Sequence, residues 1–275
     1  MCEGDIMKNI IEMENINFSY NKNQIFKNLN LTFEKSSFTT IIGNNGSGKS
    51  TLIRLLVGLL VCEGKITING LELNHDNLKK IISKIGVVFE NPDDQFVAET
   101  VLDDIVFSLE NMQVDKKEID KRVKKISKFI GIEDILDKEP HNLSGGQKQL
   151  VALASALITD PDILILDEAL TMIDPDTRIK IYKILEQINK VNKITIINVT
   201  HNMDEILYGD NLIVMDKGNI VLNGPKEFVF LEEKTFNKLG LKLPFIVELT
   251  TKLQYYGLID HLIFDMEELV NEIWK

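Results

Sequence analysis

The sequence predicts an α/β fold, in which a parallel core sheet carries an antiparallel β subdomain, an inserted helical subdomain and a helical C-terminal extension. Three observations predict it. Residues 38–42 form a buried-type strand that runs into a glycine-rich loop and then into helical spacing over 49–60. The unbroken apolar run 163–166 is typical of a central parallel strand covered on both faces. Over 99–137 the β-branched alternation gives way to charged amphipathic helix patterns.

The remaining elements follow from the same periodicities. Residues 10–33 alternate apolar and polar positions, so we expect antiparallel strands there. Further strands are expected at 65–69, 85–89, 194–199, 212–215 and 220–222. Further helices are expected at 116–130, 145–159 and 175–191, and then in a tail that is broken at Pro244 and Gly257. We therefore place a main domain over 8–230, with the helical subdomain inserted at about 95–155, and a C-terminal extension over 231–275.

Composition and charge exclude several classes of protein. Hydrophobic residues make up 44% of the 275 positions, which is ordinary for a globular chain with a sizeable core. The longest apolar stretch, 55–62, is far shorter than the roughly 18 residues of a membrane span, so we expect no segment that crosses a bilayer. The net charge of -11 argues against a nucleic-acid partner, because such proteins normally neutralise phosphates with a basic surface.

The first residues and the cysteines indicate in which cellular compartment the protein works. Residues 1–9 lack an apolar core, so we expect no secretory signal there, and Met7 offers an alternative start. Cys2 and Cys62 suit neither a zinc site nor a disulfide framework, which fits a reducing cytosol.

The loop after 38–42 has the P-loop pattern. Its residues, with the one that follows, are the expected nucleotide contacts: Gly43, Asn44, Asn45, Gly46, Ser47, Gly48, Lys49, Ser50 and Thr51. The glycines let backbone N–H groups turn toward phosphate oxygens, and the helix N-terminus adds a positive partial charge. Lys49 can reach the β- and γ-phosphates, and Ser50 is the natural magnesium ligand. A glycine-rich turn with a chance lysine is the alternative, which the strand and helix on either side disfavour.

Two carboxylates follow the run 163–166 directly. Asp167 and Glu168 therefore lie at the carboxyl end of a central strand, where open α/β sheets bind ligands. We expect Asp167 to hold magnesium, directly or through water, and Glu168 to act as the general base toward the attacking water. The alternative is a solvated acidic pair at the end of a strand.

A second helix terminus can receive an anion. Ser144 stands three residues before Gln147, in the S-x-x-Q form of a capping box. Gly145 and Gly146 follow the cap and expose backbone N–H groups. A simple capped helix is the alternative for this segment on its own.

In combination these motifs resemble those of the ABC ATPases. Residues 143–147, LSGGQ, match the family signature, with the P-loop before them and Asp167 and Glu168 after them. The resemblance covers roughly residues 10–230 and implies a P-loop NTPase core. It also implies that ATP is sandwiched between the P-loop of one subunit and the signature helix of the other, so that hydrolysis requires a dimer.

The resemblance implies roles for three further residues. Tyr20 stands where the family stacks an aromatic ring on adenine, although core packing is an alternative for such a ring. Asp174 matches the loop that crosses the dimer interface, and His201 matches the switch histidine that contacts the γ-phosphate. The other histidines have no such match and are expected at the surface or in packing: His75, His141 and His261.

Two separated regions are similar to the ATPases of energy-coupling-factor importers, which take up vitamins or transition-metal ions. They are 89–104, which contains FENPDDQFV, and the tail segments 239–245 and 266–270. The residues of the first region resemble those of the first of the two ATPase paralogues of this type. The resemblance implies ATP and Mg²⁺ as ligands and a location at the cytoplasmic face of the cell membrane. It implies three partners: a second, related ATPase subunit in a heterodimer, a membrane scaffold docked near the loop after Phe89, and a substrate-binding membrane subunit.

The sequence departs from the family at four positions. Glu90 replaces the glutamine that contacts magnesium and the attacking water, which makes Glu90 a candidate metal ligand. The alternative is that Gln95 has taken over that contact through a shifted loop. Leu150 replaces an arginine, and Leu170 and Thr171 replace a small polar pair, which we expect to alter packing or the dimer surface without removing catalysis.

The rival function is that of a soluble ABC-class ATPase not coupled to transport. Such proteins carry tandem cassettes or a long coiled coil between the motifs, and the sequence has neither. A non-hydrolysing scaffold is disfavoured because the catalytic set is complete: Lys49, Asp167, Glu168 and His201.

Overall fold

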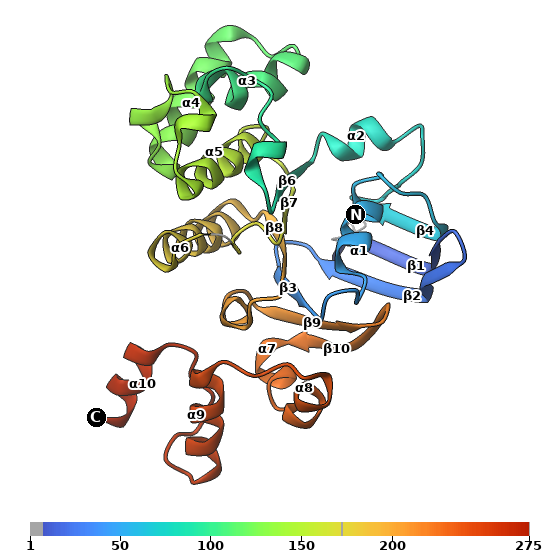
Figure 1. The fold of residues 1–275 in the computed structure, drawn as a ribbon, viewed down its shortest axis with the longest axis vertical. Helices are drawn as coiled ribbons and strands as arrows, with labels where there is room; N and C mark the ends of the chain where they lie inside the picture. Colours follow the sequence, from blue (N-terminus) through green and yellow to red (C-terminus); the bar gives the residue numbers. More distant parts are fainter. Residues whose placement is uncertain (1–7, 172, 275) are drawn as a thin grey trace, which may run out of the picture.

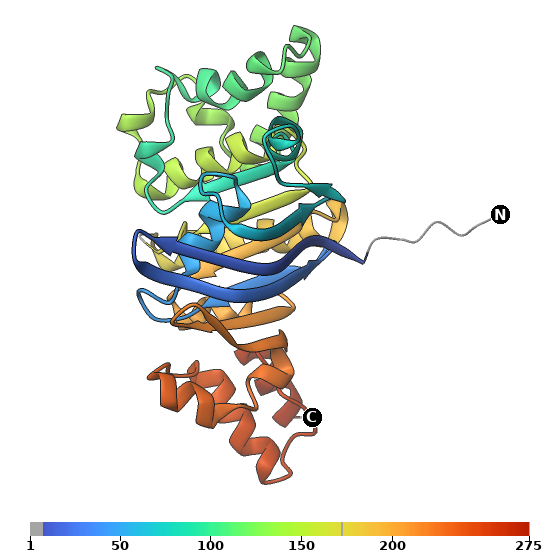
Figure 2. The same cartoon turned by 90° about the vertical axis from the view of Figure 1, so that its right-hand side faces the viewer.

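The computed structural model describes residues 8–171 and 173–274, which form two sheets with helices above, between and below them (Figures 1 and 2). The expectations about the first residues, with Cys2 and Met7, lie outside the described part of the chain. In both views the inserted helices lie at one end of the molecule and the C-terminal helices at the other. No helix in the described ranges is long and apolar enough to cross a membrane.

The core is a six-stranded sheet in the order β10-β9-β3-β8-β7-β6. The strands from β9 to β6 pair in parallel, and β10 pairs antiparallel with β9. Their bounds are Phe38–Ile42 (β3), Ile85–Phe89 (β6), Ile163–Asp167 (β7), Thr195–Thr200 (β8), Asn211–Asp216 (β9) and Asn219–Pro225 (β10). The carboxyl ends of β3, β6, β7 and β8 therefore meet at one edge of the sheet. Gly43, Glu90, Glu168 and His201 each follow one of these ends.

The antiparallel subdomain is a four-stranded sheet in the order β2-β1-β4-β5. Its strands are Asn9–Tyr20 (β1), Asn23–Glu34 (β2), Glu63–Ile68 (β4) and Leu71–Glu72 (β5). Helix α1 (Lys49–Leu56) shares one buried apolar cluster with this sheet and with the core sheet. That packing fixes the start of α1, and therefore the P-loop, between the two sheets.

The first helix is shorter than its apolar spacing predicts. We expected it to run to residue 60, but it ends at Leu56. Gly58 has φ 71, and a Cβ there would lie 2.5 Å from Leu78 Cδ1. The left-handed glycine turns the chain away, and Leu59 and Leu60 donate their N–H groups back to Arg54 O at 2.9 and 3.2 Å.

The helical subdomain packs three amphipathic helices together. They are α3 (Val101–Asn111), α4 (Lys116–Ile130) and α5 (Gly145–Leu157), and their buried faces join the cluster that also holds α6 (Pro175–Asn192). Two elements that sequence spacing did not reveal lie before it: the short helix α2 (Leu78–Ile82) and the 3-10 helix η1 (Pro92–Asp94).

The C-terminal extension covers the β9 side of the core sheet. After α7 (Lys226–Val229) of the main domain, its helices are α8 (Glu233–Leu239), α9 (Phe245–Tyr255) and α10 (Met266–Ile273). Phe230, Phe236 and Val247 join Ile42 and Leu212 in one buried cluster, so the extension is part of the core packing. Pro244 precedes α9 and Gly257, with φ 69, follows it, which confirms both expected breaks.

Candidate nucleotide site

The P-loop needs its glycines for two different reasons. A Cβ at Gly43 would lie 2.2 Å from Met215 O, and one at Gly48 would lie 2.9 Å from the Phe26 ring. Gly46 has open space around it but adopts φ 80, which a side chain disfavours. The loop therefore curls tightly at the start of α1, where unpaired N–H groups and the helix dipole favour an anion.

Lys49 lies buried inside this loop, with 4% of its surface exposed. Its Nζ donates to Gly43 O at 2.7 Å and lies 3.9 Å from Glu168 Oε1. Burial lowers the pKa of Lys49, and the charges of Glu168 and Asp167 oppose that shift. The ammonium is thus placed between the loop carbonyls and the two carboxylates at the end of β7.

Two polar atoms at this edge have no hydrogen-bond partner within the described ranges: Ser47 Oγ and Asp167 Oδ1. Burial, and then the charge of Glu168, raises the pKa of Asp167, while Arg54 and Lys49 oppose the shift. Buried polar atoms are almost always paired, so the two atoms are suited to a ligand that supplies the missing partners.

The residues fit a magnesium ion that is held mainly by phosphate and water. The described residues contain no group of three or more His, Cys, Asp or Glu side chains placed to hold a metal. Mg²⁺ in nucleotide sites usually takes one or two protein oxygens and completes its shell with phosphates and water. Asp167, with its unpaired oxygen, and Ser50, exposed in the first turn of α1, supply oxygens of the right kind.

Glu168 is held from two sides. Its Oε2 lies 2.8 Å from His201 Nδ1, and its Oε1 faces Lys49. Its backbone is left-handed, with φ 53, and its N–H donates to Val199 O on β8 at 2.9 Å. A left-handed non-glycine residue costs about 1–3 kcal/mol and persists where the surroundings impose it, typically at functional sites. The structure thus brings together Lys49, Glu168 and His201 from three different elements.

The signature segment starts α5 with the expected capping box. Gln147 N donates to Ser144 Oγ at 3.3 Å, and Ser144 N donates to Gln147 Oε1 at 3.0 Å. A Cβ at Gly146 would lie 3.0 Å from the Thr177 methyl group, and Thr177 N donates to Asp174 Oδ1 at 2.9 Å, which caps α6. The signature helix and the Asp174 loop are therefore neighbours.

The two halves of the expected ATP sandwich are separate within one chain. Across residues 8–171 and 173–274, no hydrogen bond or ion pair joins 144–147 to 43–51. Tyr20, at the end of β1, has 38% of its surface exposed and meets Phe18 edge-on at 4.9 Å, so it is not a core residue. The three other histidines are exposed, as expected.

The loop after β6 carries both residues that the alternatives for Glu90 concern. Glu90 is exposed and has no partner in the described chain, yet its charge adds the smallest of the contributions that raise the pKa of Asp167, after burial and the charge of Glu168. Gln95 is engaged elsewhere: its Oε1 accepts from Phe89 N at 2.9 Å and its Nε2 donates to Val87 O at 3.1 Å. In the structure Gln95 therefore pairs with the edge of β6, so the shifted-loop alternative would require it to give up both of these bonds.

Several contacts around the site were not foreseen. Lys148 pairs with Asp93 at 2.6 Å, and Gln149 Nε2 donates to Phe89 O at 3.2 Å, so α5 is tied to the loop after β6. Asn44 Nδ2 donates to Leu239 O at 2.8 Å, which links the P-loop to the C-terminal extension. These partners are far apart in sequence, and no local pattern signals them. The substituted Leu150 and Leu170 are buried in the same cluster, as expected for packing residues.

Comparisons with known proteins agree with this geometry. The family model described as ABC transporter matches residues 26–171. The energy-coupling factor transporter ATP-binding protein EcfA1 of Mesomycoplasma hyopneumoniae (strain 7448) is 39% identical over 270 residues, 97% of this chain and 98% of that protein. Its namesake from Ligilactobacillus salivarius is 42% identical over 267 residues, 96% of this chain and 95% of that protein.

Solved structures give the same result. The structure of cbiO1 from Clostridium perfringens, described as part of the ABC transporter complex cbiONQ, has a TM-score of 0.78 at 37% identity and covers 88% of this chain and 98% of its own. The dimeric ATP-binding cassette MJ0796, bound to ADP and Pi, has a TM-score of 0.71 at 28% identity and covers 78% of this chain and 98% of its own. The chain belongs to the ABC transporter family and, within it, to the ATP-binding proteins of energy-coupling factor transporters.

Proposed function

We propose that the chain hydrolyses ATP at sites shared with a second, related ATPase subunit, and that this hydrolysis powers an energy-coupling factor importer of vitamins or transition-metal ions. One observation carries the proposal. The Glu168 carboxylate is held between Lys49 and His201 at the carboxyl edge of the core sheet, while the signature segment that would complete the site makes no hydrogen bond or ion pair to the P-loop in the described part of its own chain.

The P-loop residues bind the phosphates. Backbone N–H groups at the start of α1 donate to phosphate oxygens, and Lys49 exchanges its bond to Gly43 O for one to the β- and γ-phosphates. Tyr20, exposed at the end of β1, stacks on the adenine ring. Ser50 and Asp167 would hold magnesium, with Glu90 as a further candidate ligand. When bound, this ion neutralises charge on the β- and γ-phosphate oxygens.

Glu168 and His201 act on the attacking water. The Glu168 carboxylate orients a water molecule toward the γ-phosphorus and accepts its proton as the new P–O bond forms and the bond to ADP breaks. His201 holds one carboxylate oxygen at 2.8 Å and reaches the γ-phosphate with its other ring nitrogen. Ser144, Gly145, Gly146, Gln147 and Asp174 face the nucleotide of the partner subunit.

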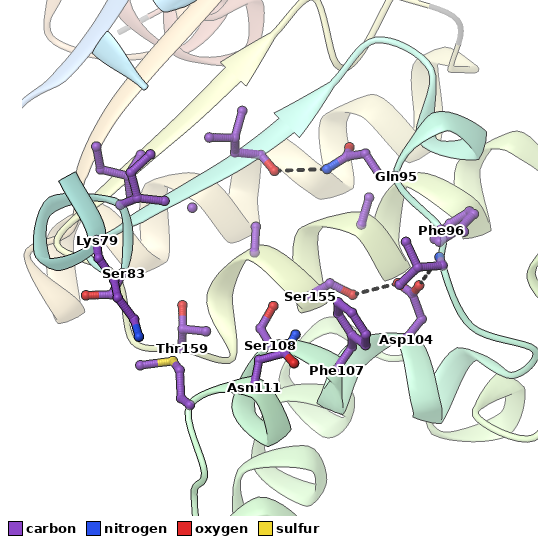
Figure 3. Close-up of a pocket in the computed structure, with 18 residues that line it drawn as sticks. Lys79, Ser83, Gln95, Phe96, Asp104, Phe107, Ser108, Asn111, Ser155 and Thr159 are labelled. Carbon is purple, nitrogen blue, oxygen red and sulfur yellow. Dashed lines mark hydrogen bonds between the residues drawn. The ribbon is translucent and has the colours of Figure 1, made fainter. Parts of the chain in front are cut away.

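A groove beside the loop after β6 suits the membrane scaffold subunit (Figure 3). Its volume is about 470 Å³, and it lies between α2, α3 and α5. Ile82, Val97, Phe107 and Met112 line it and are large exposed apolar side chains. The buried carboxylate of Asp104 lies in the same groove and accepts hydrogen bonds from Val97 N and Ser155 Oγ. An apolar groove with exposed side chains of this kind can receive the apolar face of one amphipathic helix from a partner.

Docking there places the chain peripherally at the cytoplasmic face of the cell membrane. It also explains how transport and hydrolysis communicate. Gln95 and Phe96 in the groove belong to the loop that begins at Glu90, and Gln95 is bonded to the end of β6. A helix that enters the groove would move the loop that leads to the magnesium site.

A reconstitution experiment tests the proposal. The isolated chain should hydrolyse ATP slowly, and the rate should rise when the partner ATPase and the scaffold are added. Phe107→Glu, in the groove, should abolish capture of the scaffold, whereas the matched control Val191→Glu, at an exposed position on α6, should not. A purified monomer as active as the full complex contradicts the shared site, and normal capture by Phe107→Glu contradicts the groove.

A further inference from the structure

A buried polar cluster lies beneath the segment that carries His201. Glu205, on the 3-10 helix η4 (Met203–Leu207), has 2% of its surface exposed. Tyr182, on α6 and fully buried, donates its hydroxyl to Glu205 Oε2 at 2.7 Å. The same hydroxyl oxygen accepts from Asn198 Nδ2 at 2.9 Å, and Asn198 lies on β8, three residues before His201. The cluster thus bonds to both β8, which precedes His201, and η4, which follows it.

The segment between His201 and Glu205 has little freedom. Asn202 caps η4 by accepting from Asp204 N at 3.0 Å, and its own N–H donates to Thr200 Oγ1 at 3.0 Å. Its side-chain amide lies 3.4 Å from Glu205 Oε1. A displacement of Glu205 is therefore transmitted to His201 through a chain segment that is bonded at both ends.

Arg178 connects this cluster to the loop before α6. Its Nη2 donates at 2.8 Å to Ile173 O, the carbonyl directly before Asp174. Its Nε lies 3.8 Å from Glu205 Oε1 and has no hydrogen-bond partner among the described side chains and backbone. A small relative shift of the two loops would bring this pair within hydrogen-bond distance, because the charges are opposite and already face each other.

Stability alone gives no reason for such a cluster. Burying a carboxylate is expensive, and packed apolar side chains would stabilise the same place as well or better. A satisfied polar network instead fixes one arrangement of the groups it joins. Here the groups joined are the His201 segment and the Asp174 loop.

We propose that Glu205, Tyr182 and Arg178 are positioning residues that set His201 and the Asp174 loop relative to each other. The proposal rests on the proposed roles of His201 and Asp174. Asp174 lies beside the signature helix, which the proposed function places against the partner subunit's nucleotide. When the partner engages that loop, Arg178 moves against Glu205, the 3.8 Å gap closes, and His201 is placed for hydrolysis. Dimer assembly thereby sets the position of His201 in the same chain.

Two variants and a matched control test this link in the assembled complex. Glu205→Gln keeps the shape but removes the charge that faces Arg178, and Tyr182→Phe removes only the hydroxyl. Tyr208→Phe is the control, because the Tyr208 ring stacks on Tyr182 at 3.9 Å but its hydroxyl makes no bond in the described chain. We expect both test variants to lower kcat about tenfold with an unchanged dissociation constant for ATP, since misplacing a reacting group costs rate without touching the phosphate loop.

A double-mutant cycle separates positioning from a merely structural role. If Glu205 acts through His201, Glu205→Gln should lower the residual single-turnover rate of His201→Ala less than about twofold. Equal losses in both backgrounds, or lowered melting temperatures with kcat within twofold of the wild type for both test variants, would overturn the proposal. A His201→Ala variant that hydrolyses ATP normally would instead contradict the site itself.

Discussion

Glu90→Gln probes the magnesium side of the site most selectively. Glu90 is exposed and unpaired in the described chain, and its charge raises the pKa of Asp167. Removing the charge should therefore make Asp167 easier to ionise and reduce repulsion toward the phosphate oxygens, and the new amide supplies an N–H for the attacking water. An exposed charge acts through high dielectric and contributes about 1 kcal/mol or less to each close neighbour, which is about a fivefold effect on rate at most.

The assay is the steady-state ATPase rate of the assembled complex across a magnesium series. We expect Glu90→Gln to hydrolyse ATP at an equal rate or up to about fivefold faster, with little change in the magnesium optimum. Gln95→Ala is the companion variant, and it should weaken coupling to the scaffold because Gln95 holds the end of β6. A loss of tenfold or more in Glu90→Gln alone would refute this reasoning and make Glu90 an essential metal ligand or auxiliary base.

Three further predictions concern the P-loop and the end of β7. Lys49→Ala should lose ATP affinity, because a methyl group cannot replace an ammonium among phosphate oxygens, and unchanged binding in titration calorimetry would contradict the P-loop assignment. Burial raises the pKa of Asp167, so the folded chain holds its proton more tightly, and the stability this gives is lost as pH rises through the raised folded pKa. Asp167→Asn removes the carboxylate that is ionised at neutral pH, so it should raise the melting temperature of the nucleotide-free chain there and remove the further rise on adding Mg-ATP. A lowered melting temperature would refute that sign. Asn44→Ala removes the bond to Leu239 O, so it should increase hydrogen exchange in α8 without changing the exchange of α4. Unaltered protection of α8 would show that this bond does not stabilise the C-terminal extension.

Local patterns predicted the strands, the helices and the loop that starts α1. The P-loop glycines and the capping box of Ser144 depend on neighbouring backbone, so their geometry follows from short stretches of sequence. The predicted end of α1 was wrong because apolar spacing continues past Gly58. Only the contact with Leu78 shows why the chain must turn there.

The contacts that organise the site could not be predicted in the same way. The left-handed backbone of Glu168 is imposed by β8, and the pairing of Gln95 with the edge of β6 depends on how the loop folds back. Glutamate is usually a surface residue, and the burial of Glu205 against Tyr182 arises only when η4 packs on α6. Such features come from tertiary packing, which overrides what each short segment prefers.

The general base is the central claim, and Glu168→Gln in the assembled complex tests it most directly. Glutamine preserves the shape and can still bond His201, but it cannot accept the proton of the attacking water. We expect ATP binding to persist, the ATP-bound dimer to accumulate, and turnover to fall on the order of a hundredfold or more. Near-normal steady-state hydrolysis by this variant would contradict the account.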